Sequence, residues 1–252
     1  MSYKEKTLTL IVPIYNEQAR LSENVPQLIS YIESWATGSR LIFVDDGSND
    51  FTVAKIEAII SEYASICTSV EKRPHLGKGA SVRYGLNMAT TELAAFCDID
   101  LSTPLEELSR LVELSSEIGG LAIGSRTLPG SRTVERGSLR REIAGRTFNS
   151  LVRALLCPGI YDTQCGAKAA PTQVWHEILR DSVENGFAWD VEILAKALGS
   201  AIKVLEVAVH WSHDSRSRVN VGRDGLRMLG AVFRLKFRLV YHRLRTNWAT
   251  LT

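Results

Sequence analysis

The chain has 252 residues and a net charge of +2, and 45% of its residues are hydrophobic and 23% charged. This composition is typical of a soluble globular protein with a full core. The four cysteines lack the CxxC spacing and histidine partners of a zinc site, so we expect reduced thiols and no disulfide framework. The polar start and the lack of an uncharged apolar run of about 18 residues predict neither a signal peptide nor a membrane span.

Strand and helix patterns alternate along the first half of the chain. Apolar, often β-branched runs predict five strands, at residues 7–14, 41–44, 68–71, 93–97 and 120–124. Apolar residues at helical spacing predict helices over residues 23–35, 51–63 and 80–89. This order predicts a mainly parallel α/β sheet with helices on both faces. Ligands of such sheets bind at the carboxyl ends of the strands.

A fourth helix is expected to begin near Thr103, with Pro104 in its first turn and a capping box between Thr103 and Glu106. Residues 125–146 are rich in Arg, Gly and Ser and predict a mobile loop, which leads into a helix near residues 148–156. We expect one domain over residues 1–220 and a basic amphipathic helical tail over residues 221–252.

Two carboxylates, Asp98 and Asp100, follow the apolar run at residues 93–97. At positions i and i+2 after a strand they point in roughly the same direction. Such a pair can hold Mg²⁺ or Mn²⁺, which prefer oxygen ligands and keep positions open for a phosphate. The alternative, a solvated turn, is more common for an isolated Asp-x-Asp. Acidic or amide-bearing residues at the ends of two other predicted strands, at residues 16–17 and 45–46, favour a shared site.

The strand ends at residues 12–17 and 44–48 can bind a nucleotide, because a carboxylate there can meet a base amide or ribose hydroxyls and Gly47 permits a tight turn. Lys78 lies between two glycines and can approach a pyrophosphate, although the spacing matches neither a Walker A loop nor GxGxxG. Solvated turns remain the alternative for these segments.

Seven arginines lie between Arg126 and Arg153, and their guanidinium groups suit a second phosphate. The alternative is a solvated basic loop. Further along, Asp190 and Glu192 stand in apolar surroundings, where a carboxylate needs a partner or a role. They can orient a sugar hydroxyl or accept a proton, and helix capping is the competing interpretation.

The end of the chain is strongly basic: nine of the 30 basic residues, and only one of the 28 acidic ones, lie from Arg216 onward. In a helix, four arginines form one ridge beside an apolar stripe; they are Arg227, Arg234, Arg238 and Arg245. This pattern is typical of a helix on an anionic membrane surface. The alternative is a C-terminal helix that packs on the body of the protein.

Together these motifs resemble family 2 glycosyltransferases of GT-A fold, and in particular the polyprenyl-phosphate (dolichyl-phosphate) hexosyltransferases. The motifs occur in order over residues 7–220, at residues 12–17, 44–48, 77–80, 98–104, 123–126, 162–168 and 187–192. The resemblance implies inverting transfer of a hexose from a nucleotide sugar to an isoprenoid monophosphate. This chain departs from the family pattern at Ala167, where an aromatic residue is usual between Gly166 and Lys168.

The resemblance and the strand-end pattern assign roles to individual residues. The donor nucleotide is expected to meet Pro13, Tyr15, Glu17, Asp45, Lys78 and Asp98. Asp98 and Asp100 are expected to hold Mg²⁺ or Mn²⁺, with Asp100, Asp190 and Glu192 as the catalytic candidates. The acceptor phosphate is expected to meet Arg126, Arg140 or Arg141, and Arg218.

The residues 98–104 and 162–166 look more like the glucosyl branch, so UDP-glucose is the preferred donor. GDP-mannose, a UDP-N-acetylhexosamine, or a soluble enzyme with a non-lipid acceptor are the alternatives. We expect a peripheral enzyme at the cytoplasmic face of a membrane, held by the basic tail or by a membrane partner protein. Nucleic-acid binding is disfavoured because no recognised motif is present and the body is acidic.

Overall fold

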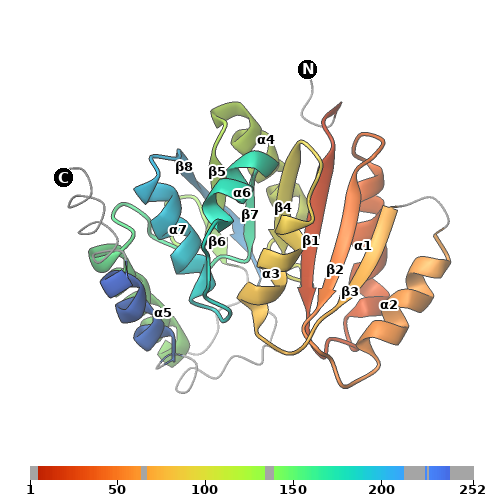
Figure 1. Ribbon diagram of the computed structural model, residues 1–252, viewed down its shortest axis with the longest axis horizontal. Coiled ribbons are helices and arrows are strands. Elements are labelled where there is room, and N and C mark those ends of the chain that lie inside the picture. Colours follow the sequence, from red (N-terminus) through yellow and green to blue (C-terminus); the bar gives the residue numbers. More distant parts are fainter. Residues whose placement is uncertain (1–4, 64–66, 134–138, 213–224, 226, 239–252) are drawn as a thin grey trace, which may run out of the picture.

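The computed structural model describes residues 5–63, 67–133, 139–212, 225 and 227–238. Its main sheet has seven strands in the order β3-β2-β1-β4-β7-β5-β8 (Figure 1). Their bounds are β1 (Leu8–Ile14), β2 (Arg40–Asp45), β3 (Cys67–Lys72), β4 (Leu93–Cys97), β5 (Leu121–Ser125), β7 (Ala167–Pro171) and β8 (Val204–Ala208). A small second sheet pairs β6 (Arg132–Thr133) with β9 (His210–Trp211).

Helices cover both faces of the main sheet, as the alternating pattern predicts. One face packs against α1 (Leu21–Glu33), α2 (Thr52–Ser61) and α4 (Leu105–Ile118). The other packs against α3 (Lys78–Asn87), α6 (Thr172–Leu179) and α7 (Trp189–Gly199), and the end of α5 (Leu139–Leu155) joins this second core. Successive residues of β1 alternate between the two cores, Leu10 in the first and Ile11 in the second. The fold is the predicted mainly parallel α/β architecture.

Four strands, β6 to β9, were not predicted from the sequence, and β7 departs most from the predicted parallel pattern. β7 runs antiparallel between β4 and β5, whereas β1 is parallel to both β2 and β4. Its sequence is Ala-Lys-Ala-Ala-Pro, and alanine, lysine and proline are all depleted in strands. Burial between two neighbouring strands therefore determines this element, rather than any local preference.

Two local predictions are wrong. Helix α4 begins at Leu105 with Pro104 at its N-cap and no side-chain capping bond, because Pro104 is still extended and Thr103 lies outside the helix. Thr103 is instead buried, with its hydroxyl 3.8 Å from Cys165 Sγ. The predicted loop at residues 125–146 contains β6 and the first half of α5, so the helix expected near residues 148–156 begins much earlier.

The described part of the basic tail is helical over residues 227–238. Val232 and Leu235 are buried in the same core as Trp175 and Trp189, so this helix packs on the body through one face. Lys236 Nζ also donates to the carbonyl oxygen of Leu155 at 2.7 Å. The expected boundary at residues 220–221 lies outside the described residues. Among those described, no helix combines the length and apolarity needed to cross a bilayer.

Candidate active site

The carboxyl ends of β1, β2 and β4 lie together at one edge of the sheet, because these strands are adjacent and parallel. We call the loops that follow them, together with the loop that leads from β3 to Lys78 at the start of α3, the strand-end site. The backbone N–H of Asn16 donates to Ser48 Oγ at 2.8 Å. The next N–H, that of Glu17, donates to Thr52 Oγ1 at 2.7 Å. Asp45 is buried and accepts from the N–H of Ser48 at 3.1 and 3.2 Å, so the first two loops are held as one unit.

Asp46, which follows β2, holds a further loop. Its carboxylate accepts from the N–H groups of Leu76 at 2.8 Å and Gly77 at 3.0 Å. A carboxylate oxygen of Asp46 also lies 2.8 Å from His75 Nδ1. This loop leads directly into α3, so Asp46 sets where Lys78 stands in the first turn of that helix. Sequence reasoning had assigned Asp46 no role of its own.

Lys78 and Asp98 form an ion pair that is open to solvent. Lys78 Nζ lies 2.5 Å from Asp98 Oδ1, and the two side chains are 21% and 36% exposed. Burial lowers the pKa of Lys78, but the charges of Asp98, Asp190 and Asp100 outweigh it, so the pKa lies above its ordinary value. Lys78 therefore carries its charge at neutral pH, where it can meet an anion.

Asp100 lies in the turn after β4, and its Oδ1 accepts from the N–H of Ser102 at 3.0 Å. Burial raises the pKa of Asp100, and the charge of Asp98 raises it further. A divalent cation bound to both carboxylates would remove this repulsion. Their oxygens fit Mg²⁺ or Mn²⁺, which need only one or two carboxylates when substrate phosphates complete the shell. The described residues contain no group of three or more His, Cys, Asp and Glu side chains placed to hold a metal.

Gly166 makes room for Asp98. A Cβ atom on Gly166 would lie 1.9 Å from Asp98 Oδ2, so a residue with a side chain cannot occupy this position unless Asp98 moves. Gly166 immediately precedes β7, where Ala167 pairs with Cys97 of β4. The start of β7 thus shapes the acidic site. Ala167 itself is fully buried in the sheet.

Arg126, expected at the acceptor phosphate, is held by Asp162. Arg126 Nε and Nη2 donate to the two carboxylate oxygens at 2.7 and 2.8 Å, and its backbone N–H donates at 2.9 Å. Burial raises the pKa of Asp162, but Arg126 outweighs it and the pKa lies below its ordinary value. The Arg126 side chain is 28% exposed, against 1% for Asp162. The other expected acceptor residues are not placed: Arg218 and the side chains of Arg140 and Arg141 lie outside the described part.

Asp190 and Glu192 lie in the first turn of α7, and both are buried. Asp190 Oδ1 accepts from Lys168 Nζ at 2.6 Å. Glu192 accepts from Ser182 Oγ at 2.6 Å and from the N–H groups of residues 183 and 184 at 3.0 Å. Asp190 is thus paired with a buried lysine, and its charge contributes to the raised pKa of Lys78, whereas Glu192 is bonded to the turn before α7.

The remaining residues expected at the donor nucleotide, Pro13, Tyr15 and Glu17, lie at the end of β1 and in the loop that follows it. The ring of Tyr15 stacks on that of His75, with centroids 4.3 Å apart and planes inclined by 19°. Glu17 Oε2 accepts from Arg20 Nη1 at 2.6 Å. Pro13 is buried within β1, so it does not present a polar group to the strand-end site. The stacked pair of rings was not predicted, since the two residues are far apart in the sequence.

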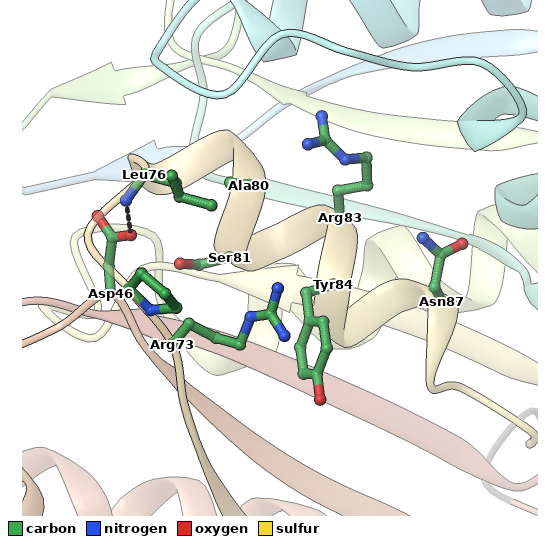
Figure 2. Close-up of a pocket in the computed structure, with 9 residues that line it drawn as sticks. Asp46, Arg73, Leu76, Ala80, Ser81, Arg83, Tyr84 and Asn87 are labelled. Atoms are coloured by element: carbon green, nitrogen blue, oxygen red, sulfur yellow. Dashed lines mark hydrogen bonds between the residues drawn. The ribbon is translucent and has the colours of Figure 1, made fainter.

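A cavity of about 150 Å³ lies beside this site, between α3 and the loop after β3. Figure 2 shows Asp46 bonded to Leu76 at one end of it and Arg73 beside the Tyr84 ring, with the guanidinium carbon 4.1 Å from the ring centroid. Ser81, on the lining helix, is 2% exposed, and its hydroxyl has no hydrogen-bond partner within the described residues. Asp46 thus borders both the cavity and the loop that carries Lys78.

Residues 9–177, about two thirds of the chain, match the family described as "Glycosyl transferase family 2". A dolichyl-phosphate beta-glucosyltransferase from Dictyostelium discoideum is 29% identical over 242 residues, covering 92% of this chain and 74% of the relative. Glycosyltransferase AglD from Haloferax volcanii is also 29% identical, over 97% of this chain but only 39% of its own length.

Among solved structures, glucosyl-3-phosphoglycerate synthase from Mycobacterium tuberculosis superimposes with a TM-score of 0.65 at 21% sequence identity. The match covers 92% of this chain and 80% of that one, and the complex contains Mn²⁺, UDP-glucose and phosphoglyceric acid. At this level of identity the likeness shows the shared fold.

Proposed function

The chain belongs to glycosyl transferase family 2, and from this premise we propose that it transfers glucose from UDP-glucose to a polyprenyl or dolichyl monophosphate with inversion. Relatives such as the Dictyostelium enzyme are dolichyl-phosphate beta-glucosyltransferases, and the mycobacterial enzyme of the same fold was crystallised with UDP-glucose. The observation that supports this function best is the strand-end site, where the open Lys78–Asp98 pair and Asp100 stand at the ends of parallel strands.

The donor would lie along the loops that follow β1, β2 and β3, which hydrogen bonds hold together. Asp45 meets the nucleoside, Tyr15 offers a ring for the base, and Lys78 meets the diphosphate. Pro13 supports the end of β1, from which the first loop starts, and Glu17 contributes through the shape of that loop. Because the loops are already held by hydrogen bonds, these groups need little rearrangement to receive a ligand.

Asp98 and Asp100 would hold Mg²⁺ or Mn²⁺, an ion that supplies positive charge to the departing nucleoside diphosphate. Lys78 adds a second positive charge at the same place, since its ammonium is held against Asp98. The acceptor is a phosphate monoester that is already anionic at neutral pH, so no strong general base is needed. Catalysis then depends on alignment of the two substrates and on charge stabilisation.

Arg126 would hold the acceptor phosphate, with Arg140 or Arg141 and Arg218 completing its contacts. Asp162 fixes the guanidinium of Arg126 by two bonds, which limits how far it can move. Asp190 and Glu192 are proposed near the transferred sugar. Glu192 would act through the turn that it anchors at residues 182–184.

The test is turnover of a panel of nucleotide sugars with a polyprenyl phosphate, in Mg²⁺ or Mn²⁺ and in EDTA. We expect glucosyl lipid from UDP-glucose, loss of product in EDTA, and loss of product for Asp100→Ala. A product only from GDP-mannose or a UDP-N-acetylhexosamine would change the donor. Transfer to soluble 3-phosphoglycerate with no lipid product would instead identify a soluble acceptor. Full turnover by Asp100→Ala would overturn the site.

We further propose that the tail helix contacts an anionic membrane surface at the cytoplasmic face. Phe233 and Phe237 are 48% and 74% exposed, although neighbouring residues of the same helix are buried. Arg234 is 69% exposed beside them. Exposed aromatic side chains flanked by arginine suit the boundary between lipid headgroups and acyl chains.

Co-sedimentation with vesicles of phosphatidylglycerol and phosphatidylcholine tests this contact. We expect binding by the wild type and a loss of most binding by Phe233→Ser/Phe237→Ser. Phe51→Ser is the matched control, because Phe51 is 71% exposed but lies at the start of α2. Equal sedimentation of all three proteins would contradict a membrane role for the helix. No sedimentation of the wild type would point to a membrane partner protein instead.

A further inference from the structure

Lys168 is a fully buried cation in the middle of the sheet. It lies in β7 opposite Phe96 of β4, and none of its side chain is exposed. Its Nζ donates to the carbonyl oxygen of Cys165 at 2.7 Å and to Asp190 Oδ1 at 2.6 Å. An apolar side chain of similar size would fill this space without the cost of removing two charges from water. Stability alone therefore does not explain a lysine at this position.

Asp190, the partner of Lys168, lies in the first turn of α7, which packs against the start of α3. Trp189, next to Asp190, approaches Gly79, next to Lys78, so closely that a Cβ on Gly79 would lie 2.3 Å from Trp189 Cβ. The backbone N–H of Ala80 donates to the carbonyl oxygen of residue 185 at 3.0 Å, across the same junction. The first turns of α3 and α7 are thus locked together, and each carries one of the two charged residues.

The junction thus joins two ion pairs, Lys168–Asp190 and Lys78–Asp98. The side chains of Lys168 and Asp190 are buried, whereas those of Lys78 and Asp98 are partly exposed to solvent. The charge of Asp190 also contributes to the raised pKa of Lys78, after that of Asp98. Lys78 and Asp190 lie in the first turns of these two joined helices, so Lys78 is influenced by two carboxylates: Asp190, which a buried lysine fixes, and Asp98 in the strand-end site.

We propose that Lys168 is a positioning residue, which through Asp190 holds the ammonium of Lys78 where the donor diphosphate binds. Without the negative charge of Asp190, Lys78 is attracted by Asp98 alone. It then competes more strongly with a cation for that carboxylate and is less available to the diphosphate. The inference rests on the proposed function only in the identity of the donor, since it concerns the affinity for a nucleoside diphosphate.

The experiment compares Lys168→Met, Asp190→Asn and Lys168→Met/Asp190→Asn with the wild type. Each protein is characterised by its melting temperature, by calorimetric titration with UDP in the presence and absence of Mn²⁺, and by kcat and KM for UDP-glucose. Lys196→Met is the matched control, because Lys196 lies on the same helix but bonds to the carbonyl oxygen of Arg180.

We expect each single variant to melt at a lower temperature, because one buried charge loses its partner. The double variant regains most of this loss, since neither charge remains. UDP affinity and kcat/KM, in contrast, stay reduced by about 10-fold in the double variant, an effect of the size seen when a residue that orients a ligand-binding group is lost. Lys196→Met changes neither. Should Lys168→Met fail to fold, Asp190→Asn and the double variant still give the comparison.

A double variant with the UDP affinity and turnover of the wild type would overturn the inference, because Lys168 would then serve only the stability of the fold. Failure of the proposed function gives a different result. If no variant transfers sugar to lipid but UDP affinity still falls in the double variant, the positioning role stands and the acceptor must be reassigned.

Discussion

Two lysine–aspartate pairs of the same chemistry lie in very different surroundings. Lys78 and Asp98 are 2.5 Å apart with side chains 21% and 36% exposed. Lys168 and Asp190 are 2.6 Å apart with side chains 0% and 5% exposed. The first pair is open to a bound substrate and the second is almost fully buried, so the two pairs share their chemistry and differ in exposure.

The difference arises from where each residue stands relative to the sheet. Asp98 follows the last residue of β4 and therefore projects beyond the strand edge. Lys168 lies inside β7, where the register places it against Phe96, with β4 and β5 on either side. The antiparallel strand β7 thus buries the Lys168–Asp190 pair. Gly166, just before this strand, leaves room for Asp98 of the other pair.

The largest effect is expected from Asp98→Asn, which breaks the open pair. We expect kcat/KM to fall roughly 10³-fold, since several kcal/mol of charge stabilisation depend on this carboxylate. The melting temperature should change little, because the pair is partly solvated and contributes little to stability. Steady-state kinetics and a thermal melt check both parts. A large loss of stability with normal turnover would reverse the comparison between the pairs.

Asp162→Asn sharpens the comparison between exposed and buried pairs, because in the Arg126–Asp162 pair only Asp162 is fully buried. Removing one partner of a buried pair should lower the free energy of unfolding at pH 7 by roughly 3 kcal/mol. The pKa of Asp162 is lowered in the folded state. Its contribution is therefore complete above the ordinary pKa and is lost as pH falls through the lowered one.

Urea unfolding at pH 7 and pH 3 measures this dependence. The difference between wild type and Asp162→Asn should narrow at the lower pH, because the carboxylate of the unfolded wild type takes up a proton before that of the folded protein. A difference that stays constant across this range would show that the carboxylate charge is not what stabilises the fold here.

Gly166→Ala separates the position of Asp98 from its charge. The added methyl group would displace the carboxylate, and a misplacement of about 1 Å can cost roughly 10²-fold in rate. Gly199→Ala is the control, since a Cβ there meets nothing within 4 Å. Turnover and Mn²⁺ titration are the measurements. Equal activity of the two variants would mean that Asp98 tolerates displacement.

The first half of the fold could be predicted from the sequence because its strands are apolar runs of ordinary composition and its helices have regular spacing. The positions of Asp45, Asp98 and Asp100 followed from that order, since the ends of adjacent parallel strands meet. Lys168 and Gly166 could not be placed, because β7 has a composition that disfavours strands and pairs with β4 from about 70 residues away. The capping box failed since Pro104 itself takes the cap position.

The hydrogen bonds that join Asn16, Ser48 and Asp45, and those from Asp46 to Gly77, have a consequence for how donor preference can change. They fix the backbone of several loops during folding, so the ordering entropy is already spent when a nucleotide arrives. Substitutions that leave these bonds intact can alter the side chains facing the base without remodelling the loops. We therefore expect relatives with different donors to differ at exposed side chains such as that of Leu76, which contacts Asp46 through its backbone, and to retain the residues that hold the loops together.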